Sequence, residues 1–420
     1  MPRLRKTARI RTAELILMLP ASLMILLLLS PITASALPKL TAPAQLMSVA
    51  PFPADGFGWS VAAGDGLVAV GAPFSTSSGN VSLFNAATGT LLLKLTSPIN
   101  TGLDGFGWSV ALGDGLLVVG APLEFSAGHV DAFGYPIQGG NAYVFNASTG
   151  GEVSTLTSPN PQYRGFFGQS VSVGDGVIVV GTFENTVGEY DAYVFSAHTG
   201  SLLFTLTSPN PQPGGSFGSS VSVGSGLIVV GAPLESSAGR DSSGNAYAFN
   251  SHTGSLMLTF TNPDPNPLGV FGGGEFGWSV SVGDGRIVVG APEDGALGLQ
   301  PGPGYAFVFS ANTGRLVSHL VGDLGPGQFG LSVSAGGGLI VAGAPYETVN
   351  GHPEAGAAYV FSTQTAHLVS KLTSPSSLTK AYFGWSVGAN LALVVVGAPV
   401  PFTPPVYGEP GSAYIFYIKH

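Results

Sequence analysis

Five glutamates recur at one place in the sequence, just after an aliphatic segment that ends in Gly-Ala-Pro or a variant of it. They follow the third residue of that motif by one or two positions and are Glu124, Glu184, Glu235, Glu293 and Glu347. Carboxylates gathered from several repeats would attract cations, basic ligands or a sugar bound through calcium bridges. Alternatively, they are solvated loop residues or bond the backbone of nearby Gly-rich loops. We treat them as candidate ligand-binding residues.

Tryptophan is a second residue type whose placement is suited to binding, since every copy follows a Phe-Gly pair. The four residues are Trp59, Trp108, Trp278 and Trp385. Exposed indole rings stack on sugars, whereas the same place in several repeats favours packing against a neighbouring repeat. We expect the packing role.

Catalytic patterns are missing from the sequence. It contains no Gly-x-Ser-x-Gly, His-Glu-x-x-His or phosphate-binding loop motif, and it has no cysteine. His198 and His252 stand at equivalent Thr-Gly turns, where a surface residue is favoured over a catalytic base. We therefore predict that the chain is not an enzyme and holds no cofactor.

The elements that position these residues belong to a unit that occurs seven times. Each unit begins with the pair Phe-Gly, whose phenylalanines are Phe57, Phe106, Phe167, Phe217, Phe276, Phe329 and Phe383. Each copy continues, with variations, through Ser-Val, a Gly-rich turn, an aliphatic run ending in Gly-Ala-Pro, a variable loop, Ala-Tyr-x-Phe, Thr-Gly and Leu-Thr-Ser-Pro. The apolar pieces are short, rich in β-branched and aromatic residues, and bounded by turn formers, so they predict strands.

Seven units of four strands predict an all-β fold, a seven-bladed β-propeller of four-stranded antiparallel blades. The last unit stops after its third strand, Ala413–Phe416, while a segment near the N-terminus, Lys39–Pro43, matches the fourth-strand segment Lys94–Pro98. Pairing the N-terminal strand with the last blade would complete it and close the ring, which protects strand edges. We predict that closure.

The segments Phe106–Val110 and Gly120–Pro122, with their equivalents, resemble the FG-GAP repeats of the integrin α-subunit head and of many exported microbial proteins. The resemblance covers residues 37–420 and implies a seven-bladed propeller that serves in adhesion and ligand binding. The third unit departs from the pattern, because Gly181-Thr182-Phe183 replaces Gly-Ala-Pro.

Calcium-binding members of that family carry an Asp-x-Asp-x-Asp-Gly loop where this chain has short turns with one aspartate at most. The turns with an aspartate are Gly64–Gly66, Gly113–Gly115, Gly174–Gly176 and Gly283–Gly285. One carboxylate cannot supply the about six to eight oxygen ligands of Ca²⁺. We predict tight hairpin turns there rather than calcium sites.

The first 36 residues predict a secretory signal peptide, with an N-terminal membrane anchor as the alternative. Five basic residues precede the apolar run Leu15–Leu29, and Ala34–Ala36 offers a cleavage site. Residues 37–420 are predicted to form the propeller domain. The full chain has a net charge of −9, and without the five basic residues and Glu14 of the first 36 residues the domain is more acidic still. This charge and the lack of a basic cluster in the domain disfavour nucleic acid and anionic membranes as partners. We expect a secreted or cell-surface protein that contacts a membrane only if the segment is retained.

The two rims of the predicted ring differ in their loops. One rim has short, similar turns, whereas the other has long, unlike loops such as 123–141 and 346–357. Function gathers on irregular loops held by a rigid scaffold. We therefore expect a binding scaffold that recognises a protein ligand through the variable loops, with a carbohydrate-binding lectin as the alternative. A quinoprotein-like or lyase enzyme is less favoured, because quinoprotein repeats have a docking tryptophan after the Thr-Gly turn and these units do not.

Overall fold

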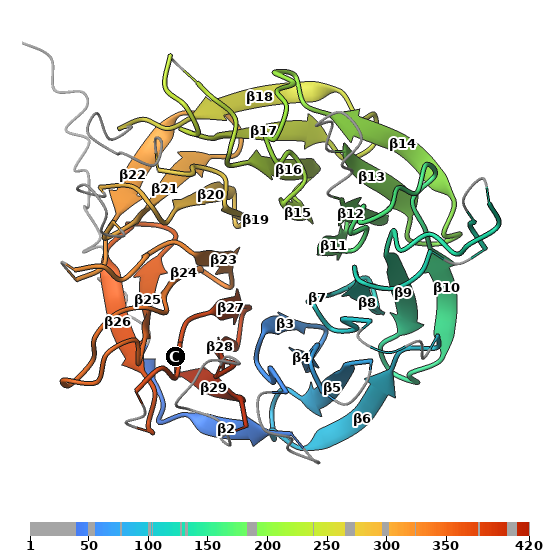
Figure 1. Cartoon of the computed structure of the whole chain (residues 1–420). Helices are drawn as coiled ribbons and strands as arrows, with labels where there is room; N and C mark the ends of the chain where they lie inside the picture. Colours follow the sequence, from blue (N-terminus) through green and yellow to red (C-terminus); the bar gives the residue numbers. More distant parts are fainter. Residues whose placement is uncertain are drawn as a thin grey trace, which may run out of the picture. The chain divides into compact units, whose positions relative to one another are not determined.

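Seven antiparallel sheets stand around a central axis in the computed structural model (Figure 1). The structure describes residues 39–48, 55–75, 78–99, 102, 104–126, 128–130, 133–182, 191–237, 239–264, 274–295, 302–323, 325–376, 379–400 and 410–419. Within those ranges no helix has the length and apolarity needed to cross a bilayer. The predicted seven-bladed propeller is confirmed, and the predicted signal segment, residues 1–36, lies outside the described residues.

Blades 1 to 4 follow one another along the chain, each from its innermost strand outward. Blade 1 comprises β3 (Ser60–Gly64), β4 (Leu67–Ala72), β5 (Asn80–Asn85) and β6 (Leu91–Thr96). Blade 2 comprises β7 (Ser109–Gly113), β8 (Leu116–Ala121), β9 (Asn141–Asn146) and β10 (Glu152–Leu156). Blade 3 comprises β11 (Ser170–Gly174), β12 (Val177–Gly181), β13 (Asp191–Ser196) and β14 (Leu202–Thr207). Blade 4 comprises β15 (Ser220–Gly224), β16 (Leu227–Ala232), β17 (Asn245–Asn250) and β18 (Leu256–Thr261).

Blades 5 to 7 complete the ring, and the last of them takes strands from both ends of the described chain. Blade 5 comprises β19 (Ser279–Gly283), β20 (Arg286–Ala291), β21 (Tyr305–Ser310) and β22 (Leu316–Leu320). Blade 6 comprises β23 (Ser332–Gly336), β24 (Leu339–Ala344), β25 (Ala357–Ser362) and β26 (Leu368–Thr373). Blade 7 comprises β27 (Ser386–Ala389), β28 (Leu393–Ala398) and β29 (Ser412–Lys419), with β1 (Lys39–Leu40) and β2 (Ala44–Met47) both paired to β29.

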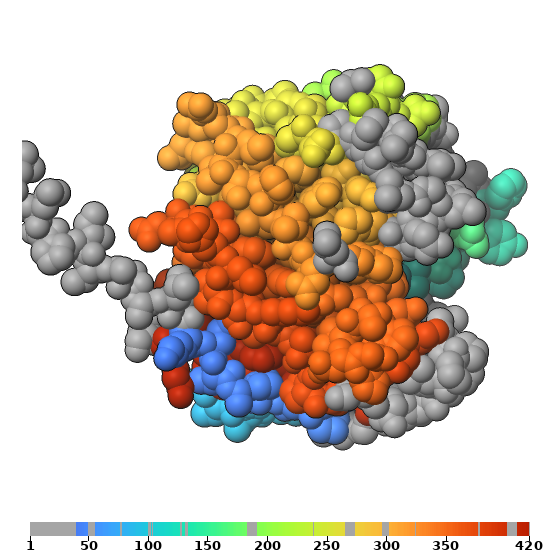
Figure 2. All heavy atoms as spheres, turned by 90° about the vertical axis from the view of Figure 1, so that its left-hand side faces the viewer, coloured from blue at the N-terminus to red at the C-terminus, as the bar shows by residue number. Residues whose placement is uncertain are grey.

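The N-terminal strand closes the ring, as predicted, but in a different register. Leu40 pairs with Ile418, while Leu46 pairs with Ala413, the residue equivalent to Val81 in blade 1. Val81 itself pairs with Leu95, so Leu46 takes the place of Leu95 in the blade. The expectation that Lys39–Pro43 fills that place is therefore wrong by six residues. Figure 2 shows the blue N-terminal residues against the red C-terminal ones.

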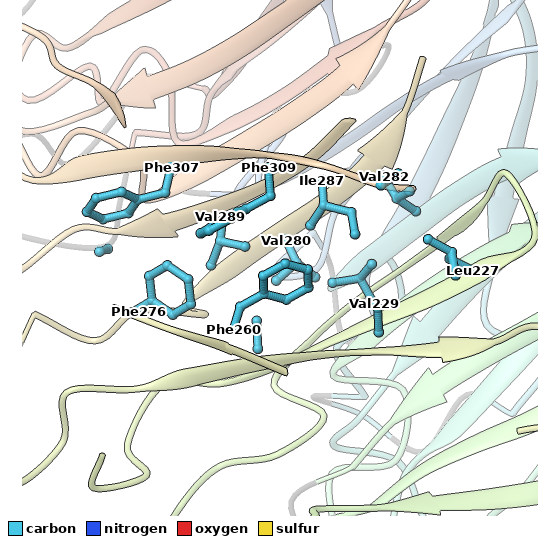
Figure 3. Close-up of a cluster of buried hydrophobic side chains, with 14 residues drawn as sticks. Leu227, Val229, Phe260, Phe276, Val280, Val282, Ile287, Val289, Phe307 and Phe309 are labelled. Carbon is cyan, nitrogen blue, oxygen red and sulfur yellow. The ribbon is translucent and has the colours of Figure 1, made fainter. Parts of the chain in front are cut away.

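The cores lie between blades rather than at one centre. One cluster takes Val229 and Phe260 from blade 4 and Phe276, Val289 and Phe309 from blade 5 (Figure 3). The second strand of a blade is covered on both faces, and β16 is buried at every position. Each blade thus buries its large side chains against its neighbour.

A hydrogen bond repeated seven times joins the blades near the axis. The serine of each Phe-Gly-x-Ser segment donates from Oγ to the carbonyl oxygen of the Phe-Gly glycine in the next blade, at 2.7–2.8 Å. The pairs are Ser60–Gly107, Ser109–Gly168, Ser170–Gly218, Ser220–Gly277, Ser279–Gly330, Ser332–Gly384 and Ser386–Gly58. Because the last pair returns to blade 1, this series of bonds is a closed circle.

The same close approach explains the glycine of Gly-Ala-Pro. A Cβ added to Gly231 would lie 1.9 Å from the carbonyl oxygen of Gly277, closer than any carbon and oxygen can come without bonding. Gly181 in blade 3 meets Gly218 at the same distance. Blade 3 therefore tolerates Thr182 after this position but keeps its glycine.

The Gly-Asp-Gly segments form tight hairpin turns, as predicted. Gly64 pairs with Leu67 across the turn, and Asp65 has a φ of 52°. Its Oδ2 accepts a hydrogen bond of 2.9 Å from the N–H of Gly115 in the next turn. Three further pairs repeat this contact: Asp114–Gly176, Asp175–Gly226 and Asp284–Gly338. These aspartates therefore connect neighbouring turns.

Candidate ligand-binding rim

The tryptophans lie on the rim that carries the variable loops. Ser60 at the start of β3 pairs with Gly71 near the end of β4, so the residue before β3 and the loop after β4 share one end of the sheet. That end holds Trp59 and Phe74, while the Gly-Asp-Gly turns occupy the other end. The candidate rim therefore combines irregular loops with aromatic side chains.

Three tryptophans form a continuous cluster at the inner edge of this rim. The ring centroid of Trp59 lies 5.1 Å from that of Trp108 and 4.9 Å from that of Trp385, and Phe74 packs edge-on at 5.1 Å. The x-Ser-Val segments of all seven blades surround a cavity of about 280 Å³ here. The rings pack across blades 7, 1 and 2, as expected, but at the mouth of the axial channel, where they stay partly exposed.

Beside this cluster lies a cavity of about 360 Å³, which we call the mouth pocket. Its lining comes from blades 5, 6 and 7 and comprises Glu275, Trp278, Pro292, Glu293, Gln328, Leu331, Tyr346 and Trp385. Trp278 is 42% exposed, and the rings of Tyr346 and Trp385 lie 6.4 Å apart. The pocket thus has aromatic walls and polar groups within one concave site.

Two of the polar residues reach the pocket from a left-handed backbone position just before Phe-Gly. Glu275 has a φ of 57° and Gln328 a φ of 51°, whereas blades 1 and 2 use Gly56 and Gly105 there. A side chain in this conformation costs about 1 kcal/mol relative to glycine. Phe166, Ser216 and Tyr382 adopt the same conformation in blades 3, 4 and 7, so this cost belongs to the repeat position. What distinguishes blades 5 and 6 is that a long polar side chain stands there and lines the pocket.

Two carboxylates make the pocket electronegative. Burial, and secondarily the charge of Glu293, raises the pKa of Glu275 to about 7. Gln328 donates a hydrogen bond from Nε2 to Glu293 Oε1. None of the described residues that line the pocket is a lysine or arginine. A cation is therefore the charge that would complement this site.

The side chains define what the pocket can do chemically. Indole and phenol faces beside carboxylates attract cations through cation–π and Coulomb interactions. The same aromatic faces, with an amide and carboxylates as hydrogen-bonding groups, also suit a sugar ring. Within the described part of the chain, no group of three His, Cys, Asp or Glu residues is placed to hold a metal ion.

Two of the predicted rim glutamates are inside the protein. Glu124 is 0% exposed and Glu235 is 1% exposed. Glu124 accepts hydrogen bonds from Asn141 Nδ2 at 2.9 Å and Tyr143 OH at 2.5 Å, and also from Ser97. Burial raises the pKa of Glu124 to about 7, although these hydrogen bonds act in the opposite direction. The expected exposure of both glutamates is wrong, because residues of the preceding blade and of their own blade enclose them.

The other predicted glutamates are separated from one another. Glu293 lines the mouth pocket, Glu347 is 9% exposed and bonded to Lys371, and Glu184 lies outside the described residues. In blade 5, Asp294 occupies the position equivalent to Glu124. It accepts a hydrogen bond of 2.9 Å from Asn262 Nδ2. The described glutamates therefore do not form a single acidic ring, and their part in ligand binding stays a prediction.

The mouth pocket was largely missed by sequence reasoning. Glu275, Gln328 and Tyr346 were not singled out, and Trp278 was expected to be covered by packing. The available signal was variation at the residue before Phe-Gly, which differs between blades and is a long polar residue in blades 5 and 6.

Comparison with known proteins agrees with the repeat pattern. The family model described as FG-GAP repeat matches residues 204–249 and 326–361. A search of the curated proteins finds no match. The family model thus matches at two places, and the ring of seven blades is consistent with an FG-GAP repeat propeller.

Proposed function

We propose that this chain of FG-GAP repeats is a binding module outside the cytoplasm that recognises a protein partner through the mouth pocket and the surrounding variable loops. The observation that carries the proposal is the pairing of an exposed indole, Trp278, with two carboxylates, Glu275 and Glu293, in one concave site. FG-GAP repeat proteins are often extracellular or on the cell surface. Export through the N-terminal segment belongs to the same proposal.

The partner's anchoring group in this proposal is a lysine or arginine side chain. The raised pKa of Glu275 reflects a carboxylate that is poorly solvated beside another carboxylate. A bound ammonium or guanidinium group would relieve that repulsion and would stack on Trp278 or Tyr346. A binding role without catalysis accounts for these features.

Selection of random peptides by phage display on the purified protein tests the proposal. We expect enrichment of peptides with lysine or arginine, and loss of their binding in the double variant Glu275→Gln, Glu293→Gln. Glu152→Gln is the matched control, because Glu152 is an exposed carboxylate on β10 in blade 2. Enriched peptides without basic residues, or equal loss in the control, would contradict the proposed recognition.

A carbohydrate ligand is the second candidate, and the exposure of Trp278 favours it. An indole that is 42% exposed at the edge of a pocket is placed to stack on a sugar ring. A glycan array distinguishes the two functions, since selective sugar binding that is lost in Trp278→Ala supports the lectin. N-terminal sequencing of the exported protein tests whether the first 36 residues are removed.

A further inference from the structure

A shared set of contacts fastens the junctions between blades 1 and 2, 3 and 4, and 4 and 5, and we call it the junction lock. The residue just after the last strand of one blade is a serine or asparagine that hydrogen-bonds a buried carboxylate of the next blade. Ser208 bonds Glu235 in this way, and Asn245 and Tyr247 of blade 4 donate to the same carboxylate at 2.7 and 2.5 Å. Ser97 with Glu124 and Asn262 with Asp294 repeat the first contact. These locks fill the space between blades with side chains of the protein itself.

The junction between blades 5 and 6 departs from the lock. Gly322 stands where the serine is expected, and Ala357 replaces the asparagine at the start of the third strand. A Cβ on Gly322 would come within 2.8 Å of Phe329 and 3.3 Å of Tyr359, so the rings enforce glycine here. Glu347 therefore lacks the serine and asparagine partners that its equivalents have.

Lys371 of blade 6 takes over part of their role. Its Nζ lies 2.5 Å from Glu347 Oε1 and 2.6 Å from Asp323 Oδ2, and it stands over the ring of Tyr359. The hydroxyl group of Tyr359 donates a hydrogen bond of 2.7 Å to Glu347 and accepts one of 2.9 Å from the backbone N–H of Asp323. The result is a connected polar network held by both blades.

This network forms one wall of a cavity of about 560 Å³. Further polar groups in the lining come from Thr348 and Asn350 after β24 and from Thr373 at the end of β26. That volume falls within the range of about 300–1,000 Å³ typical of small-molecule sites. No aromatic residue belongs to the described lining.

The arrangement of charge restricts the ligand. A cation entering the cavity would meet the ammonium group of Lys371, and an anion would meet the carboxylates of Asp323 and Glu347. A neutral molecule with several hydroxyl groups can donate to the carboxylates and accept from the ammonium and amide at once. We infer that the junction between blades 5 and 6 is a binding site for a neutral polyhydroxylated ligand, a sugar or polyol.

Lys371 serves in this site as a fixed donor. Burial by itself would lower its pKa, but the hydrogen bonds to Asp323 and Glu347 outweigh burial and raise the pKa above the ordinary value for lysine. The side chain is therefore an ammonium at all physiological pH values, and it keeps three N–H groups of which two are already directed to carboxylates. The third faces Tyr359. The Lys371 side chain is 30% exposed, so a ligand hydroxyl can reach the ammonium from the cavity.

The test uses saturation-transfer NMR and calorimetry on the intact exported protein with the methyl glycosides of glucose, galactose, mannose and N-acetylglucosamine. We expect saturable binding of at least one glycoside. Lys371→Met and Asp323→Asn should each weaken that binding about tenfold or more, because each removes a charged hydrogen-bonding group. Lys94→Met is the matched control, since Lys94 occupies the equivalent strand position in blade 1 and is exposed.

Each outcome decides the inference. Thermal unfolding of the variants separates lost binding from lost folding. Asp323 is 66% exposed, so we expect Asp323→Asn to leave the fold intact. The inference is overturned if no glycoside binds the wild-type protein, or if both site variants bind as tightly as it does. Binding lost in Trp278→Ala but kept in Lys371→Met would place the sugar in the mouth pocket, which supports the lectin candidate and overturns the junction site.

Discussion

Ser386 Oγ donates a hydrogen bond of 2.8 Å to the carbonyl oxygen of Gly58, a residue 328 positions earlier in the chain. The six equivalent bonds join blades that are consecutive in sequence, whereas this one joins the last blade to the first. The contact therefore forms only when blade 7 meets blade 1 and the ring is closed.

The register of that strand leads to a first prediction. Leu46 is 2% exposed and packs with Phe57 and Phe84 of blade 1, whereas Leu40 is only partly buried. Leu46→Ala should lower the free energy of unfolding by about 2–5 kcal/mol, the usual range for a buried leucine. Leu40→Ala should lower the free energy of unfolding by a smaller amount. Urea denaturation measures both, and an equal or greater cost for Leu40→Ala would contradict the observed register.

The contact of Gly231 with the next blade leads to a second prediction. Gly231→Ala should prevent folding or greatly reduce the unfolding temperature, because the new Cβ would lie 1.9 Å from the Gly277 carbonyl oxygen in backbone that cannot move alone. Gly151→Ala is the control, since the nearest atom to its Cβ is a side-chain oxygen of Thr149 at 3.4 Å. Thermal unfolding followed by circular dichroism compares them. A stable, fully folded Gly231→Ala variant would refute this interpretation of the motif.

The pKa of Glu275 leads to a third prediction, on pH. Because the folded state holds this proton up to about pH 7 and the unfolded state releases it near pH 4.5, the folded state binds more protons between those values. The contribution of Glu275 to stability is therefore present at low pH and is lost as the pH rises to about 7. Chemical denaturation of the wild type and of Glu275→Gln at pH 5 and pH 8 measures this change in the free energy of unfolding. The stability of wild type relative to the variant is expected to fall at pH 8, and a rise would disprove the assigned direction.

The turn aspartates lead to a fourth prediction, on calcium. Asp65 and its equivalents each accept a backbone N–H from the next turn and stand singly in short hairpins. A single carboxylate supplies too few oxygen ligands for tight binding of Ca²⁺. Millimolar calcium should therefore change the unfolding temperature by less than a few degrees relative to chelator. A larger rise that disappears in Asp175→Asn would show that these turns bind the ion.

Position in the repeat was sufficient to predict the strands, the turns and the number of blades. Phe-Gly, Gly-Ala-Pro and Thr-Gly are local signals, and each acts through backbone conformation or through one close contact that recurs in every blade. Closure followed from the missing fourth strand of the last unit. Its register did not, because Lys39–Pro43 matches the sequence motif, yet Leu46 rather than Leu40 packs in the core between blades 7 and 1.

Burial and grouping of the candidate site residues were decided by the tertiary structure. From the sequence, a glutamate after Gly-Ala-Pro is expected to be a loop residue. In the structure, Ser97 from the preceding blade and Tyr143 from the same blade enclose Glu124. Glu275, Gln328 and Trp385 meet at the mouth pocket because three blades converge on the axis. The sequence alone determined the repeating backbone, since that depends on neighbours along the chain. The accessibility of each carboxylate depends on residues of another blade, and only the closed ring brings those together.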